Sequence, residues 1–141
     1  MGSDKLHQSI FAKLLDVVPD LLTIESHGKS VVGGSIMDLS FDVLCRSDTK
    51  IVIALSHYYK HPSGDMIADP DMEIAVYPKR QIAEALSYQD AYIYRTVYSP
   101  DRMQVDVRAK KDLNVFLDEW LSNLVAQGHS IKAGSDVNAG A

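Results

Sequence analysis

The sequence predicts an α+β domain with a mainly antiparallel sheet of five or six strands, an N-terminal helix and a long C-terminal amphipathic helix. Apolar residues recur at helical spacing near both ends of the chain, and alternating apolar and polar residues fill the middle. No linker rich in proline, glycine or serine divides the 141 residues, a length that is ordinary for one domain. We therefore expect a single domain over residues 1–129 and a disordered tail of small and polar residues over 130–141.

The first helix is expected over residues 4–18, where apolar side chains follow a helical period. Ser3 or Asp4 can cap its start, and Pro19 ends it because proline disfavours helix at the preceding residue. The connector that follows contains two turns, one at residues 26–28 and one at residues 33–34.

The first two strands are expected over residues 37–45 and 50–59, joined by a hairpin at residues 46–49. The first alternates strictly, and Cys45 belongs to its apolar set, which predicts a small core residue rather than a catalytic thiol. The second is apolar on both faces at its start, as in a central strand covered on both sides. A third strand over residues 72–77 ends at Pro78.

The pattern over residues 81–89 fits either a helix or a strand, and we favour a strand because residues 82, 84, 86 and 88 alternate. Strands are also expected over residues 91–98 and 103–108, with a turn at residues 99–102 between them. The last helix carries an unbroken apolar stripe from Leu113 to Val125, with Asp112 as its N-cap and Gly128 just past its end. Trp120 is the expected anchor of this helix on the sheet.

The charge balance limits the classes of partner. There are 14 Lys and Arg against 19 Asp and Glu, a net charge of −5, which argues against dedicated nucleic-acid or membrane-surface binding. A lone cysteine fits a reducing cytosol, and the longest apolar run, residues 51–55, is far short of the ~20 residues that span a bilayer. These two observations predict a cytoplasmic protein. We expect no cofactor, since Thr23 stands where a phosphate-binding loop needs glycine and no Cys-x-x-Cys pair is present.

Residues 65–73 carry four acids and no base, which accounts for four of the five excess negative charges. In an extended chain alternate residues share a face, so one face would carry Asp69, Asp71 and Glu73, and another His57, Tyr59 and His61. Two imidazoles near three carboxylates could hold a divalent metal, with His57, His61, Asp69, Asp71 and Glu73 as ligands, or supply a general acid and base. The same acids also suit a polar loop, a soluble strand edge or a protein-binding surface.

Tyrosines Tyr92, Tyr94 and Tyr98 fall on one face of their expected strand. Such rings either pack beneath the terminal helix with their hydroxyls at the rim, or anchor a protein partner. Lys and Arg are too sparse nearby for the phosphate contacts of nucleic-acid binding. The candidate protein-binding residues are therefore Asp69, Asp71, Glu73, Tyr59, Tyr92 and Tyr94.

Two segments resemble a known family. The run Asp69-Pro70-Asp71-Met72-Glu73, with Tyr77, Ala83-Glu84 and Tyr88-Gln89 after it, and the closing stretch over residues 113–121, are similar to the YqiB-like family of small uncharacterised bacterial proteins. The resemblance covers residues 53–128 and implies a compact bacterial domain of unknown function, of a kind spread by mobile elements. It carries over no catalytic residue.

The leading functional hypothesis is a non-enzymatic protein-binding or adaptor domain whose acidic face contacts a basic protein. A homodimer through an exposed sheet edge is a further expectation. The competing hypothesis is a small metal-dependent hydrolase built on the His, Asp and Glu set named above.

Overall fold

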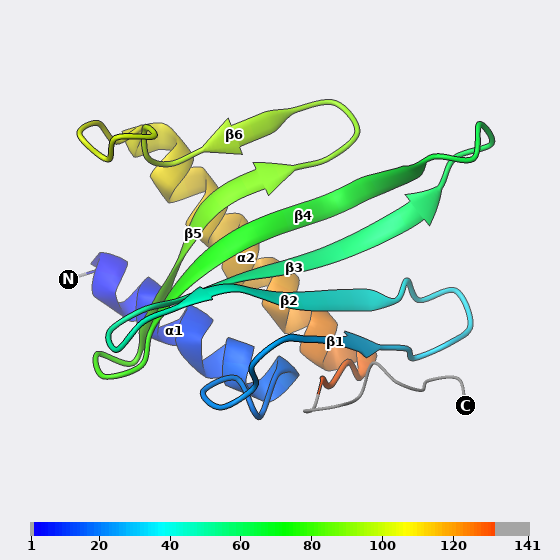
Figure 1. The fold of residues 1–141 in the computed structure, drawn as a ribbon, viewed down its shortest axis with the longest axis horizontal. Helices are drawn as coiled ribbons and strands as arrows, with labels where there is room; N and C mark the ends of the chain where they lie inside the picture. The colour runs from blue at the N-terminus through cyan, green and yellow to red at the C-terminus, as the bar shows by residue number, and fades with distance from the viewer. Residues whose placement is uncertain (1, 132–141) are drawn as a thin grey trace.

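Six strands form one antiparallel sheet in which spatial order follows chain order, β1 to β6 (Figure 1). This computed structural model describes residues 2–131. The helices are α1 (Gly2–Val17) and α2 (Val107–Gln127). The strands are β1 (His27–Ser30), β2 (Leu39–Arg46), β3 (Ile51–Lys60), β4 (Met66–Tyr77), β5 (Ile82–Gln89) and β6 (Tyr94–Thr96). Every neighbouring pair of strands is antiparallel, so the predicted α+β class and sheet type are confirmed.

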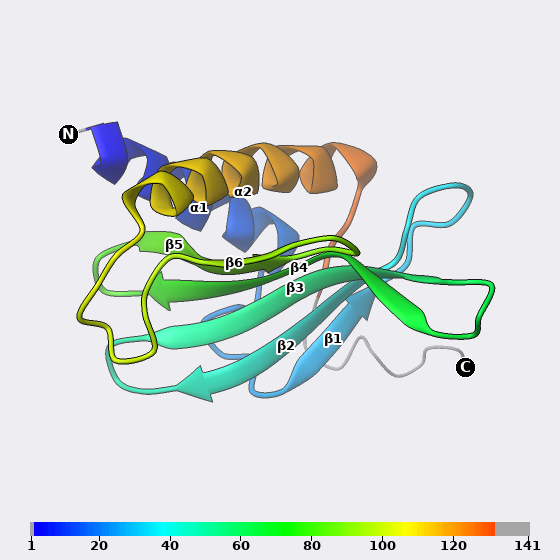
Figure 2. The same ribbon diagram turned by 90° about the horizontal axis from the view of Figure 1, so that it is seen from above.

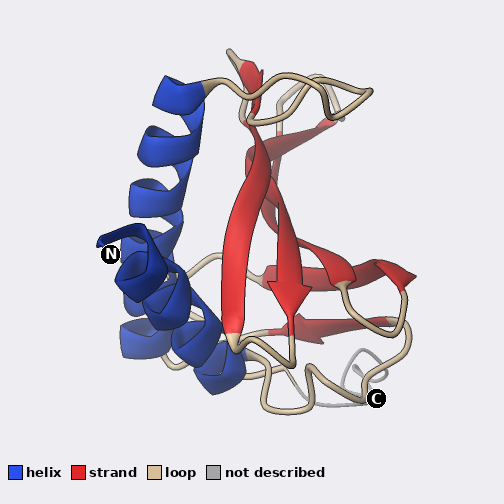
Figure 3. Cartoon of the chain, turned by 90° about the vertical axis from the view of Figure 1, so that its left-hand side faces the viewer, coloured by secondary structure: helices blue, strands red, loops and turns tan. Residues whose placement is uncertain are grey.

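Both helices lie on the same face of the sheet, and the strands twist beneath them (Figures 2 and 3). The core fills the space between these two layers. From the sheet it takes Phe41, Ile53, Leu55, Met72 and Ile74, and from the helices Ile10, Leu14, Leu117, Trp120, Leu121 and Leu124. Each large side chain buried there stabilises the fold by about 1.5–3 kcal/mol. Neither described helix lies over the opposite face of the sheet.

Several expected elements are present close to their predicted positions. The terminal helix carries its apolar stripe on the core side, and Gly128 ends it in the left-handed conformation, with φ of 91°. The ambiguous stretch over residues 81–89 is the strand β5. Its side chains alternate between the two faces until a register shift against β4.

Two strands differ from the expectation. Residues 27–30, expected to lie partly in a turn, form the short edge strand β1, with Gly28 and Ser30 buried against β2. Strand β4 begins at Met66, so much of the acidic segment is strand instead of loop. In both cases cross-strand pairing supplies backbone hydrogen bonds to residues whose own preferences are for turns.

The predicted strand over residues 103–108 is wrong. Only an isolated bridge between Tyr98 and Val105 forms there, and α2 already begins at Val107. Its N-cap is Asp106, whose carboxylate accepts a hydrogen bond from the Ala109 N–H at 2.9 Å, and not Asp112 as predicted. The cap selects the helix start because it satisfies an otherwise unpaired amide.

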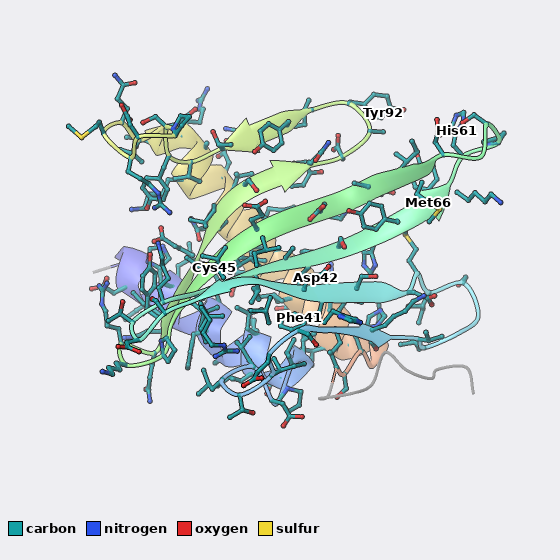
Figure 4. All side chains as sticks on the ribbon, in the orientation of Figure 1. Phe41, Asp42, Cys45, His61, Met66 and Tyr92 are labelled. Atoms are coloured by element: carbon teal, nitrogen blue, oxygen red, sulfur yellow. The ribbon has the colours of Figure 1, made fainter. Side chains whose placement is uncertain are left out.

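Cys45 is exposed and not a core residue (Figure 4). The register between β2 and β3 shifts between Val43 and Cys45, which interrupts the alternation that pointed Cys45 inward. The strand prediction was therefore right in position, but its last residues face solvent, as the exposed Leu44 also shows.

The chain past α2 is packed as far as Ile131. This residue belongs to the predicted tail, yet its side chain is fully buried and its N–H donates to the Val17 carbonyl at 2.7 Å. The rest of the predicted tail, residues 132–141, lies outside the described residues. Neither described helix is long and apolar enough to cross a membrane.

Candidate functional site

The strand register defines two faces of the sheet, because residues paired across strands point the same way. One face packs under the helices through pairs such as Phe41 with Leu55 and Leu55 with Met72. We call the other the open face. Two rows of paired residues cross it, His27–Asp42–Ala54–Glu73–Ser87–Thr96 and Lys29–Ser40–Ser56–Asp71–Gln89–Tyr94.

His57 lies on the helix side of the sheet, away from the open face. Its ring is buried, donates from Nδ1 to the Asp38 carbonyl at 2.8 Å, and meets the Trp120 ring edge-on at 5.5 Å between centroids. The His129 ring is 5.9 Å away. His57 is thus a core histidine with hydrogen-bond and ring partners.

The predicted metal set is not assembled. His61 sits at the exposed tip of the β3–β4 hairpin, where Ser63 contacts its Nδ1 at 3.0 Å (Figure 4). His57 faces the helices while Asp71 and Glu73 face the open side. Among residues 2–131 no group of three or more His, Cys, Asp or Glu is placed to hold a metal ion. The hydrolase hypothesis has no geometric support in this arrangement.

Asp71 and Glu73 share the open face, as the alternation predicted. Asp71 accepts a hydrogen bond from the Tyr58 hydroxyl at 2.8 Å. Burial, followed by this hydrogen bond, raises the pKa of Tyr58, so the hydroxyl stays a donor. Glu73 is exposed and lines a hollow of about 180 Å³ together with Tyr94.

The other predicted binding residues lie elsewhere. The register between β3 and β4 shifts so that Asp69 and Pro70 both fall opposite His57, and Asp69 therefore leaves the face of Asp71. Tyr59 follows Tyr58 in the strand and points to the opposite side. Tyr92 is at the tip of the β5–β6 hairpin and 92% exposed (Figure 4).

Small side chains form the floor of the open face. Ser56 and Ser87 are buried although no helix covers them, because larger neighbours rise on both sides. Ala54 lies between Asp42 and Glu73 in the same row. Because these side chains are small, a partner chain can approach the backbone of the sheet closely. The carboxylates of Asp42 and Glu73 then lie on the two sides of Ala54.

Sequence reasoning missed Asp42 and Tyr58 as members of this surface. Asp42 was placed on the polar face of its strand, but only the register of β2 on β3 and β3 on β4 brings it into the row of Glu73. A correct hairpin register, read from residues 46–49, is the signal that could have found it.

A second polar cluster joins the end of β4, the middle of β5 and the loop that follows β6. The Tyr77 and Tyr98 hydroxyls both donate to the Glu84 carboxylate, at 2.8 and 2.5 Å. Burial and this hydrogen bond raise the pKa of Tyr77 to about 12. Arg80 and Arg102 lie over the two rings, 5.6 and 5.1 Å from their centroids. With both tyrosine hydroxyls held as donors to Glu84, the cluster ties β4, β5 and the loop after β6 together.

The sequence of this chain matches one protein family among the family models. Residues 10–130 match the family described as Domain of unknown function (DUF6908). No curated protein and no solved structure is significantly similar to the chain. The resemblance to the YqiB-like family stays a prediction. Since the match covers most of the chain, the protein belongs to the DUF6908 family of domains of unknown function.

Proposed function

We propose that this domain is a non-enzymatic protein-binding or adaptor domain that holds a basic partner against its open face. The observation that carries the proposal is the set of carboxylates Asp42, Asp71 and Glu73 on a sheet face that no helix covers. Within residues 2–131, no lysine or arginine forms an ion pair with any of the three. Lys29, on the same face, pairs with Asp38 at 3.6 Å, so a basic partner would bring additional positive charge to the three carboxylates.

Aromatic side chains beside the acids support a protein partner. Tyr94 ends the row that contains Asp71 and is 64% exposed, and Tyr58 lies outside that row, paired with Ala68. Tyrosine is enriched at the energetic centres of interfaces because it buries a large area and keeps a hydroxyl for hydrogen bonding. Tyr58 already orients its hydroxyl on Asp71, which holds that carboxylate in place.

Affinity capture from lysate with the full chain tests this proposal. The variant D71K/E73K should lose the captured partner, while D16K/E119K, with the same change in net charge at two exposed sites on α1 and α2, should keep it. The retained partner should be basic, and its binding should weaken as salt rises. Equal capture by both variants would show that the open face is not the binding surface.

A further inference from the structure

Strand β6 is one edge of the sheet, and its hydrogen bonding leaves backbone groups directed outward. The Val97 N–H donates to the Leu86 carbonyl, and the Asp90 N–H donates to the Ile93 carbonyl. In an antiparallel pair such bonds recur at every second residue, so Ile93, Arg95 and Val97 face β5. The N–H and C=O groups of Tyr94 and Thr96 therefore point away from the sheet, and no described backbone group pairs with them.

This edge is only partly protected against pairing. Natural edge strands are blunted by shortness, lysine, proline or inward-pointing charge, and β6 is three residues long and carries Arg95 on its helix side. The β6 edge nevertheless presents Tyr92, Ile93 and Tyr94, all three exposed, and no proline or lysine. Along Tyr94–Thr96 the outer edge has no paired segment among the described residues (Figure 1), whereas residues 104–106 pair with the chain from Val97 onward. The shortness of β6 limits the number of hydrogen bonds that a partner can make here, so side-chain contacts have to add to them.

Two hollows flank β6, one on each face of the sheet. On the open face, Tyr94 and Thr96 line the hollow that contains Glu73. On the helix side, a hollow of about 210 Å³ lies between β6 and α2 and is lined by Tyr88, Ile93, Arg95, Asp112, Leu113 and Phe116. Alternate residues of an added strand would point into one hollow and then the other.

We propose, building on the proposed function, that the partner binds as a seventh strand along β6, through an extended segment that alternates basic with aromatic or large aliphatic residues. Its backbone pairs with the outward groups of Tyr94 and Thr96. Its basic side chains enter the open-face hollow toward Glu73, and its apolar side chains enter the hollow beside Phe116. Strand addition of this kind derives affinity from the main chain and specificity from the alternating pockets.

The spacing across the sheet fits this assignment. A partner residue opposite Thr96 lies three strand spacings from Glu73 along one row, about 14 Å between Cα atoms. Extended arginine and glutamate side chains together bridge that distance. The side chains between them, Ser87 and Thr96, are small and leave the path open. Arg102 also lines this hollow but lies over the Tyr98 ring.

The aromatic groove supports an apolar side chain at the next position. Phe116 packs edge-on with Tyr88, at 5.3 Å between centroids, and stacks on Trp120, yet stays partly exposed. The Arg95–Asp112 ion pair, at 3.4 Å, closes one end of the groove. An aromatic or branched aliphatic side chain placed there would cover the exposed part of Phe116.

The test uses the full chain and a capped octapeptide in which arginine alternates with phenylalanine and isoleucine, titrated by NMR and fluorescence anisotropy. Thr96→Pro removes an outward N–H that the β5–β6 ladder does not use, and Thr96→Val is its matched control with the amide kept. We expect Thr96→Pro to weaken binding about tenfold and Thr96→Val less than about threefold. A peptide N-methylated on the edge-facing amides should lose affinity similarly against the unmodified protein, whatever the effect of proline on folding. A peptide of the same composition with its arginines in one block should also bind more weakly.

Each outcome decides between the proposals. If Thr96→Pro and N-methylation leave binding unchanged while D71K/E73K abolishes it, strand addition is wrong and the proposed function stands. If D71K/E73K also has no effect, both are wrong. Failure of the wild-type chain to bind the peptide, or a dimer of this chain through β6 that the peptide does not displace, overturns the inference.

Discussion

Asn114 is the buried polar residue whose removal tests the contact between α2 and the sheet. It is 1% exposed, and its Oδ1 accepts a hydrogen bond from the Ala85 N–H at 2.8 Å. Its Nδ2 donates to the Lys110 carbonyl at 2.7 Å, which fixes the side-chain amide in one orientation. Ala85 lies where the register between β4 and β5 shifts, and there the helix supplies the acceptor for its amide.

The substitution Asn114→Ala removes both hydrogen bonds and leaves the Ala85 N–H buried without an acceptor. An unsatisfied buried donor costs about 1–3 kcal/mol, so with the lost side-chain packing we expect a loss of about 2–3 kcal/mol in the free energy of unfolding. For a domain of this size that loss lowers the melting temperature by roughly 10 °C. The exposed Asn123 on the same helix is the matched control, and Asn123→Ala should not lower it.

Thermal and urea unfolding followed by circular dichroism measure both variants. Hydrogen exchange gives a local readout, since the Ala85 amide should be protected in the parent chain and exchange faster in Asn114→Ala. If Asn114→Ala and Asn123→Ala melt together, or if Ala85 is already unprotected in the parent chain, the bridge between α2 and β5 does not stabilise the fold as reasoned.

Three further predictions concern the ends of α2. Asp106→Ala should destabilise the protein by about 1 kcal/mol and Asp112→Ala by clearly less, measured by urea unfolding, because Asp106 caps the helix. Gly128→Ala should cost about 1 kcal/mol, since alanine is strained at a φ of 91°, and an unchanged midpoint would contradict this. Burial, and then the neighbouring charge of His57, lowers the pKa of His129 below its ordinary value of 6.5. The unfolded chain then takes up this proton first, so stability should be full above pH 6.5 and fall below it, and His129→Gln should flatten a melting-temperature profile recorded from pH 7.5 to 5.

The helices and most strands could be predicted because their periodicity is a local property. The direction of each side chain follows from the backbone conformation, so the stripe from Leu113 to Val125 indicates a helix wherever the helix packs. Residues 103–108 also alternate, but they do not form a strand. Val105 makes only an isolated bridge with Tyr98, and Asp106 caps α2. Short-range alternation does not by itself supply a pairing partner.

The candidate site was only partly predictable for the same reason. Asp71 and Glu73 are two residues apart in one strand, so the period of two correctly placed them on one face. Asp69 is also two residues from Asp71, but a register shift opposite His57 removes it from that face. The predicted metal ligands are not brought together, because the side chains of His57 and Glu73, in neighbouring strands, point to opposite faces of the sheet.

The sequence by itself determined the α+β class, the positions of the helices and most strands, and the concentration of acid before and within β4. Only the tertiary structure decided that Asp42 joins Glu73, that Cys45 faces solvent, and that β6 is an edge with free backbone groups. These outcomes depend on strand register and bulges, which arise from pairing between segments distant in the chain. A local pattern is compatible with more than one such pairing, so packing of the whole sheet under the two helices makes the choice.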